Sequence, residues 1–326
     1  MTAIATEADN PSNVFARVRE FARSLIRHHE MDGQNAKTLE EHIAEITSKR
    51  EKIKLPREHF YKFCDAVNET NPLHFNPEFA KAQGLDDVIA PGMQLAALGE
   101  QYINEILIGI NQIVGVPYLP ASIEVGFGKH FVYPETKLLW VCYDYDIQGD
   151  NGAIKLSLVG GERSNLRQID LDKPEITKAD RRIIKKLGTT IEVLLQKEHS
   201  TEDKHLYGAD HKQNYALDKR SLFLESLDEN PTEFNNIPLM YPASFFTATI
   251  LDYFKSQPGG ASGIHVGSDF TFYANPIPET DLVVELFFLK ESKRMVDAVG
   301  SQNHKPSIYA ETRFLPVDKR SLLFAS

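Results

Sequence analysis

The stretch "APGMQLAALGEQYINEILIGI", residues 90–110, decides the fold. Drawn as a helix, it is apolar around most of its circumference, which predicts a helix buried in a core rather than one on a surface. The segment that follows, residues 121–169, is rich in β-branched and aromatic residues and is interrupted by Pro134 and by turn residues at 149–152. Three or four antiparallel strands are therefore expected after the helix.

The same order of elements returns in the second half of the chain. Three pairs of segments share a motif and its place in the order: 71–76 with 230–235, 90–103 with 241–254, and 134–138 with 278–282. Such agreement indicates an internal repeat. Each copy supplies one apolar helix and a set of strands, which suggests a sheet wrapped around a helix, the hotdog arrangement.

The composition is that of a chain with enough apolar residues for two domains. Of the 326 residues, 42% are hydrophobic, which suffices for one large core or two ordinary ones. Cys64 and Cys142 lie too far apart in sequence for a disulfide framework or a zinc spacing, and they fit a reducing compartment. No apolar run approaches the roughly 20 residues of a membrane span, and residues 1–13 lack the features of a secretory signal. A cytoplasmic protein is expected.

Several segments lie outside the repeat. Residues 14–29 have apolar side chains at helical spacing, and 37–50 form a second predicted helix, so this pair either anchors at a membrane surface or packs on the main body or a partner. Residues 171–217 are charged and are expected to form a connector with some helix and little strand. Within them, the basic stretch 178–186 either meets a phosphate or an acidic carrier protein or is a solvated helix face. The net charge of -10 argues against nonspecific binding to nucleic acid.

The stretch "NETNPLHFNPEFA", Asn68 to Ala80, carries a specific resemblance. It resembles the Asp-x-Asn-Pro-hydrophobic-His signature of MaoC-like dehydratases and (R)-specific enoyl thioester hydratases. The chain as a whole is similar to their double-hotdog members, with copies at about 50–170 and 218–320. The resemblance implies an α+β double hotdog, in which two antiparallel sheets each wrap around a long central helix. The two helices predicted at 14–29 and 37–50 lie outside the resemblance and are expected to form an N-terminal extension. The expected division is 1–49 for the extension, 50–170 for the first hotdog, 171–217 for the connector and 218–326 for a degenerate second hotdog.

The resemblance also implies a chemistry and its residues. Members of the family interconvert 2-enoyl and (R)-3-hydroxyacyl thioesters of coenzyme A or acyl carrier protein, as lyases that need no further cofactor and no metal. The reaction requires a base for water, an acid for the α-carbon, and donors for the thioester oxygen. Glu69 and His74 are the candidates for the acid and base, and Asn71 can orient them. Gly92 begins the buried helix, where unpaired N–H groups can hold the thioester carbonyl as an oxyanion site.

Two departures from the family pattern bear on activity. Members usually carry Gly-Asp where this chain has Asn68-Glu69, so the carboxylate is one methylene further from the backbone and the turn loses its glycine. In the second copy Glu233 stands at the histidine position, although Asp228 retains a carboxylate. The second copy is therefore expected to keep its fold without chemistry, and the resemblance implies that it widens the groove for a long acyl chain.

Alternative functions stay open at this point. A noncatalytic double hotdog that binds acyl thioesters or a partner would also explain a lapsed site at Glu69. A hotdog thioesterase is less favoured, because its carboxylate lies on the central helix, and here Glu100 and Glu105 come late on that helix. The other histidines, among them 28, 29, 199, 205 and 211, show no metal-binding pattern. A homodimer also stays open.

Overall fold

The computed structural model describes residues 52–114, 117–128, 131–148, 151–160, 182–183, 188–199, 206, 208–229, 231, 237–256, 262–288 and 295–317. The helices predicted at 14–29 and 37–50 lie outside the described residues, as do Glu233 and most of the basic stretch 178–186.

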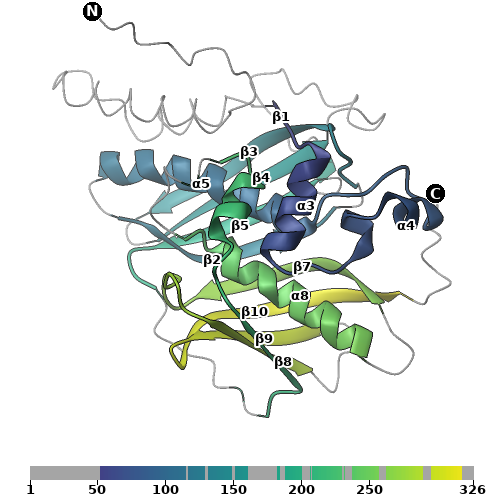
Figure 1. Ribbon diagram of the computed structural model, residues 1–326. Coiled ribbons are helices and arrows are strands. Elements are labelled where there is room, and N and C mark those ends of the chain that lie inside the picture. The colour runs from purple at the N-terminus through teal and green to yellow at the C-terminus, as the bar shows by residue number, and fades with distance from the viewer. Residues whose placement is uncertain are drawn as a thin grey trace, which may run out of the picture.

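Within the described residues, the strands form one antiparallel sheet in the order β1-β3-β4-β5-β2-β7-β10-β9-β8-β6 (Figure 1). The first five strands belong to the first half: β1 (Lys52–Lys54), β3 (Lys137–Gln148), β4 (Asn151–Gly160), β5 (Thr189–Gln196) and β2 (Leu119–Gly126). The other five belong to the second half: β7 (Ser262–Phe272), β10 (Lys305–Val317), β9 (Met295–Gln302), β8 (Leu282–Phe288) and β6 (His211–Tyr215). Read outward from the central pair β2 and β7, the two halves have the same order. The predicted double hotdog is confirmed.

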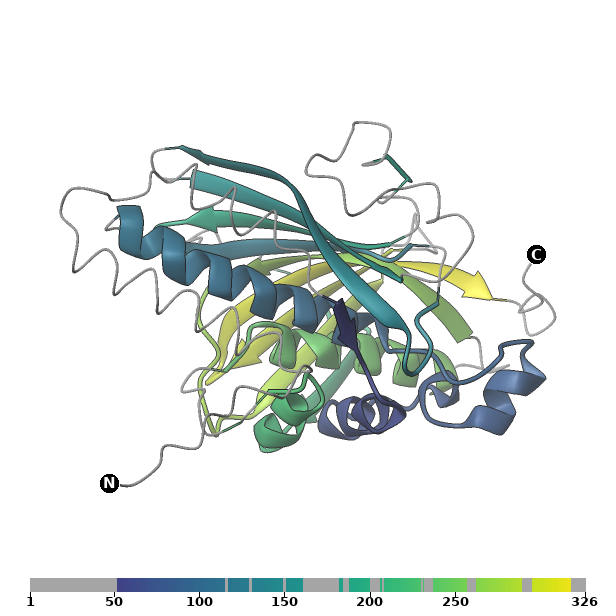
Figure 2. The same ribbon diagram turned by 90° about the horizontal axis from the view of Figure 1, so that it is seen from above.

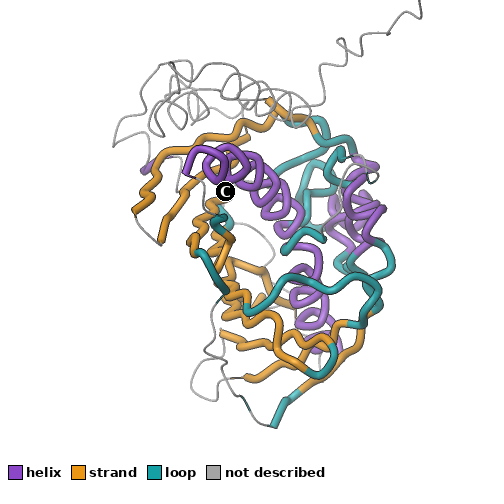
Figure 3. Tube along the Cα trace, turned by 90° about the vertical axis from the view of Figure 1, so that its left-hand side faces the viewer, coloured by secondary structure: helices purple, strands orange, loops and turns teal. Residues whose placement is uncertain are grey.

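The two long helices lie on one side of this curved sheet (Figure 2). They are α5 (Gly92–Val114) and α8 (Met240–Ser256). Every residue from Met93 to Leu98 and from Met240 to Leu251 is buried, which confirms the prediction of buried central helices. The short helices gather on the same side (Figure 3): α3 (Arg57–Ala66), η1 (Pro72–His74), α4 (Pro77–Ala82) and α7 (Arg220–Glu225).

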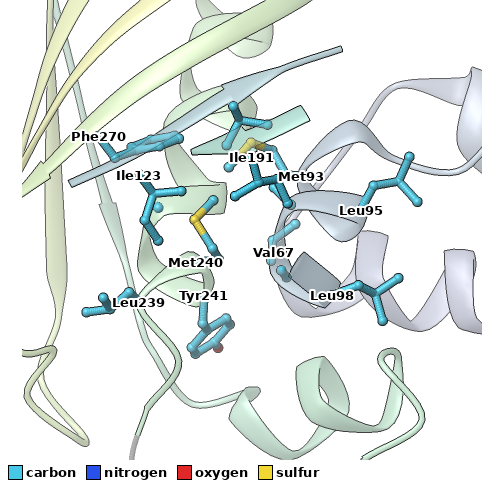
Figure 4. Packing of buried hydrophobic residues seen from close by; sticks show 14 of the residues in the cluster. Val67, Met93, Leu95, Leu98, Ile123, Ile191, Leu239, Met240, Tyr241 and Phe270 are labelled. Carbon is cyan, nitrogen blue, oxygen red and sulfur yellow. The ribbon is translucent and has the colours of Figure 1, made fainter. Parts of the chain in front are cut away.

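The halves join edge to edge through β2 and β7, which pair antiparallel. A side chain at Gly267 would place its Cβ 2.5 Å from the Val125 carbonyl oxygen, so only glycine allows the two backbones to approach at this point. Behind the seam, Met93 and Ile123 of the first half lie close to Met240 of the second (Figure 4). The two halves therefore share one continuous hydrophobic core.

The turns before β3 and β8 confirm the repeat at the level of the backbone. Glu135 and Glu279, each in a Pro-Glu-Thr turn, adopt left-handed backbones with φ of 60° and 55°. The same local sequence therefore makes the same turn in each copy.

The expectation of little strand character in 171–217 was wrong at two places. β5 lies in this stretch and pairs with both β4 and β2, and β6 pairs with β8. β5 reads TTIEVLLQ, and its side chains alternate between buried and less buried positions. The charged residues on both sides hid this short alternation, and its pairing partners lie far away in sequence.

Candidate active site

The turn after α3 carries the first candidate residue. The Glu69 N–H donates to the Cys64 carbonyl over 2.8 Å, and Asn68 before it has a left-handed backbone with φ of 54°. Glycine is favoured in this region, and asparagine is one of the few other residues that adopt it at low cost. The turn that was expected to lose its glycine therefore keeps its shape with Asn68.

Asn71 links the two candidate acid-base groups. Its backbone N–H donates to Glu69 Oε1 over 2.8 Å, and its side-chain Nδ2 lies 3.5 Å from His74 Nε2. Its Oδ1 accepts from the Leu73 N–H over 3.2 Å, which caps helix η1, and Pro72 is well suited to the first position of that helix. The structure thus brings Glu69, Asn71 and His74 together in a single turn.

His74 is held in one tautomer by the chain that follows. Its Nδ1 lies 2.9 Å from the Ile89 carbonyl oxygen. A carbonyl only accepts, so Nδ1 carries the proton, and the Nε2 lone pair of the neutral ring faces the Asn71 side-chain N–H. Burial lowers the pKa of His74, against the opposing effects of the Glu69 charge and the Ile89 carbonyl. A neutral imidazole whose lone pair is on Nε2 can accept a proton at that atom.

Gly92 is the first residue of α5, as the sequence predicts. The N–H groups of a first helical turn have no partner within the helix and lie at the positive end of its dipole. The segment leading to Gly92 is fixed, because Ile89 N–H donates to the Leu73 carbonyl and Ala90 N–H to the Val132 carbonyl. A Cβ at Gly92 would lie 2.8 Å from the Phe127 ring. Any larger residue at position 92 would therefore require the Phe127 ring to shift.

The second half contributes residues that the sequence did not single out. Thr70 Oγ1 donates to Asp252 Oδ1 over 3.3 Å, and Lys255 Nζ donates to the Thr70 carbonyl over 3.1 Å. Burial raises the pKa of Tyr215, and the charges of Asp252 and Glu69 raise it further. Nothing in the sequence pairs the end of a helix with a loop about 180 residues earlier, so no local signal could have identified these residues.

The corresponding turn of the second copy requires a correction. The Glu229 N–H donates to the Leu224 carbonyl over 3.0 Å, and Asp228 has a left-handed backbone with φ of 61°. The Glu229 hydrogen bond matches that of Glu69, and the Asp228 backbone conformation matches that of Asn68. Glu229, and not Asp228, therefore stands where Glu69 stands in the first copy, and Asp228 occupies the turn position of Asn68.

Glu100 on α5 has a structural role, because it binds the N-terminal end of α8. Its side chain is 1% exposed, and its two oxygens accept from the N–H groups of Leu239 over 2.7 Å and Met240 over 2.8 Å. It therefore caps α8 from α5 and joins the central helices of the two halves. Burial raises the pKa of Glu100 to about 7, although these hydrogen bonds favour the charged form. With both oxygens engaged, Glu100 is a poor candidate for a thioesterase carboxylate, and the Glu105 side chain lies outside the described residues.

The part of the chain that the structure describes also bears on metal binding and on membrane spanning. There, no three His, Cys, Asp or Glu side chains are grouped as metal ligands would be. None of the helices in that part is both long enough and apolar enough to span a bilayer. Cys64 is a buried free thiol, and burial raises its pKa.

Comparisons with known proteins agree with this architecture. Residues 42–119 match the family described as FAS1-like, dehydratase domain region. No curated protein matches the sequence. A MaoC-like dehydratase of known structure superposes with a TM-score of 0.55 at 12% identity, over 86% of this chain and 100% of the other. For a MaoC-like dehydratase from Phytophthora capsici the TM-score is 0.52 at 9% identity, over 85% and 99%.

A third solved structure, the full-length peroxisomal multifunctional enzyme type 2 from Drosophila melanogaster, has a TM-score of 0.51 at 10% identity. The likeness covers 96% of this chain but only 59% of that enzyme. At such identities the likeness to each of these structures concerns the fold. Together, the dehydratase-region match at 42–119 and these likenesses show a hotdog fold whose first half contains a stretch similar to a dehydratase domain.

Proposed function

We propose that this protein is a hydratase or dehydratase that interconverts 2-enoyl and (R)-3-hydroxyacyl thioesters of coenzyme A or acyl carrier protein. Its one site lies in the first half, at Glu69 and His74. The observation that carries the proposal is the bridge through Asn71, which contacts the Glu69 carboxylate with its backbone and faces His74 Nε2 with its side chain. The match of residues 42–119 to a dehydratase region supports the reaction class.

In the hydration direction, His74 Nε2 accepts a proton from a water molecule, and the hydroxyl adds to C3 of the enoyl thioester. The Nδ1 hydrogen bond to the Ile89 carbonyl keeps Nε2 as the basic atom and stabilises the ring when it becomes charged. Glu69 orients the same water. The proton taken up by His74 reaches C2 through the Glu69 carboxyl group, so one water is added and both side chains return to their starting states.

Negative charge develops on the thioester oxygen as the hydroxyl adds. The N–H groups of Gly92 and Met93, which precede the first bonded N–H of α5 at Gln94, are suited to this oxygen, because they are donors at the positive end of a helix dipole. Gly92 lacks a side chain that would block the approach of the carbonyl. Phe127, whose ring packs over Gly92, supplies an apolar neighbour for the acyl group.

The proposal is tested by offering the purified protein crotonyl, octenoyl and longer 2-enoyl thioesters, on coenzyme A and on acyl carrier protein. Loss of the enoyl absorbance measures turnover, and chiral chromatography of the 3-hydroxy product measures its configuration. Turnover with an (R) product is expected. Binding of these thioesters by calorimetry without any turnover would instead identify a noncatalytic acyl-thioester-binding protein. An (S) product would contradict the proposed arrangement of the water and the α-carbon.

A further inference from the structure

The loop that carries Glu69 is held by the opposite half of the molecule. Thr70, the next residue, makes three contacts with the last turns of α8. Its hydroxyl donates to the Asp252 carboxylate over 3.3 Å, its carbonyl accepts from Lys255 Nζ over 3.1 Å, and its hydroxyl also accepts from Lys255 Nζ. Both the backbone and the side chain of Thr70 are therefore fixed by one helix end.

Thr70 is also the point where the two copies differ in length. After the matching turns, Asn71-Pro72 follows Glu69 by two residues, whereas Asn230-Pro231 follows Glu229 directly. The second copy thus has no residue equivalent to Thr70. The contacts with α8 fix a residue that only the first copy possesses, and that residue lies directly beside the proposed catalytic carboxylate.

The electrostatic surroundings of Glu69 come from both halves. The Glu69 charge opposes the lowering of the His74 pKa in its own half, and it adds to the raised pKa of Tyr215 in the other. Asp252 and Lys255 are the charged groups of α8 on this side, and both contact Thr70. A shift of Thr70 would move the carboxylate relative to His74.

We propose that Lys255 and Asp252 are positioning residues for the active site: through Thr70, the end of α8 sets the direction in which Glu69 presents its carboxylate to the water at His74. The second half is thus part of the working site although it supplies no catalytic group. This inference rests on the proposed function. Exposed contacts of this kind contribute little to stability, but a displacement of about 1 Å at a reacting group can cost on the order of a hundredfold in rate.

The test compares Lys255→Met and Thr70→Val with a matched control. Lys212→Met removes the surface contact of a different lysine in the second half, an ion pair that joins Lys212 to Glu285 over 3.0 Å on strands β6 and β8. For Lys255→Met and Thr70→Val we expect kcat to fall about tenfold, with KM within about twofold of the wild type. Lys212→Met should keep kcat within about twofold, with the same change in unfolding temperature as Lys255→Met.

Two further variants separate positioning from a structural role. Lys255→Arg keeps a donor for the Thr70 carbonyl and should recover most of the lost kcat. The double variant Lys255→Met/Thr70→Val should lose less than the product of the two single losses, because both changes loosen the same attachment of Thr70 to the end of α8. Unchanged kcat in Lys255→Met, or losses that multiply in the double variant, would overturn the inference.

A second readout does not depend on turnover. The pKa of His74 can be followed by NMR of the histidine rings in wild type, Lys255→Met and Lys212→Met. Removing a cation would by itself raise the pKa of His74, whereas movement of Glu69 away from the ring would lower it. A fall confined to Lys255→Met supports positioning even if no enoyl thioester is turned over, in which case only the proposed function fails. A pKa that rises or stays constant in an inactive protein would overturn the inference as well.

Discussion

The two halves of this molecule share a strand order and two matching turns, yet they differ in the loop that follows their first helix. In the first half this loop continues from Glu69 through Thr70 to Asn71 and His74, and it rests on α8. In the second half Glu229 ends the same turn but is 5% exposed, and the chain passes directly to Asn230-Pro231. The hotdog scaffold therefore depends on core positions and turns that both halves share, while the proposed chemistry depends on one loop that only the first half has.

The central helices differ in a complementary way. Glu100 on α5 caps the start of α8, and Leu251 stands at the corresponding place on α8. The first half therefore stabilises the helix of the second by a cap. The second half in turn holds the loop of the first through Thr70. Neither half is a complete unit without the other.

The largest expected effect comes from the two proposed acid-base groups. His74→Ala and Glu69→Gln should each lower kcat for an enoyl thioester by about a hundredfold or more, because each removes a proton-transfer group. Steady-state kinetics measures this change. His199→Ala, which breaks a hydrogen bond to Asn275, and Glu78→Gln, which changes an exposed carboxylate on α4, are the matched controls. A kcat near that of the wild type in either active-site variant would show that the substituted residue is not a proton-transfer group of the working site.

The cap that Glu100 makes on α8 can be tested through the pH dependence of the free energy of unfolding. The pKa of Glu100 is raised in the folded protein to about 7 from an ordinary value of 4.5. The folded state therefore binds the proton of the Glu100 carboxyl group more tightly than the unfolded state does. The resulting contribution to the free energy of unfolding is fully present below pH 4.5 and is lost as pH rises toward about 7. A shift of this size corresponds to about 3 kcal/mol as an upper value.

Urea denaturation at both ends of this pH window measures the effect. The free energy of unfolding should fall more steeply with pH in wild type than in Glu100→Gln, which cannot titrate at this position. Glu78→Gln, an exposed carboxylate, should retain the wild-type slope. Equal slopes in wild type and Glu100→Gln would show that the cap stays ionised in both states.

The Glu69→Asp variant tests whether the loop of the first half is shaped for glutamate, whose side chain is one methylene longer than that of aspartate. Shortening the side chain withdraws the carboxylate from the water while keeping its charge, so we expect about a tenfold loss of kcat. The measurement is turnover of the best enoyl thioester found for wild type. A gain of about tenfold would instead identify a pocket still shaped for aspartate and a position that has decayed.

The smallest effect is expected in the second half. Glu229 occupies the turn position of Glu69, but the residue at the histidine position is Glu233, which cannot serve as a base in the way an imidazole does near neutral pH. Glu229→Gln and Glu233→Ala should each change kcat by less than about threefold in protein that remains folded. A large loss of kcat in either well-folded variant would place a catalytic residue in the second half and would contradict the proposal that only the first-half loop is catalytic.

Local sequence predicted the parts of this fold whose causes are local. The buried helices were visible because apolar residues surround them, and the turns at Glu135 and Glu279 because identical Pro-Glu-Thr stretches precede a strand in each copy. The link of Glu69, Asn71 and His74 was predictable for the same reason, since six residues in one turn hold all three. The strand β5 was missed because a short alternation between charged flanks is a weak signal without its partners β4 and β2.

By itself, the sequence determined the repeat, the double-hotdog class and the turn that carries the candidate site, because periodicity and turn chemistry act over neighbouring residues. Only the tertiary structure decided that Glu229 and not Asp228 is the counterpart of Glu69, that Glu100 caps the other half's helix, and that Lys255 holds Thr70. These facts depend on which backbone groups meet after the chain has closed around its core. Contacts between residues more than a hundred positions apart leave no period in the sequence, since they are set by the packing of whole elements.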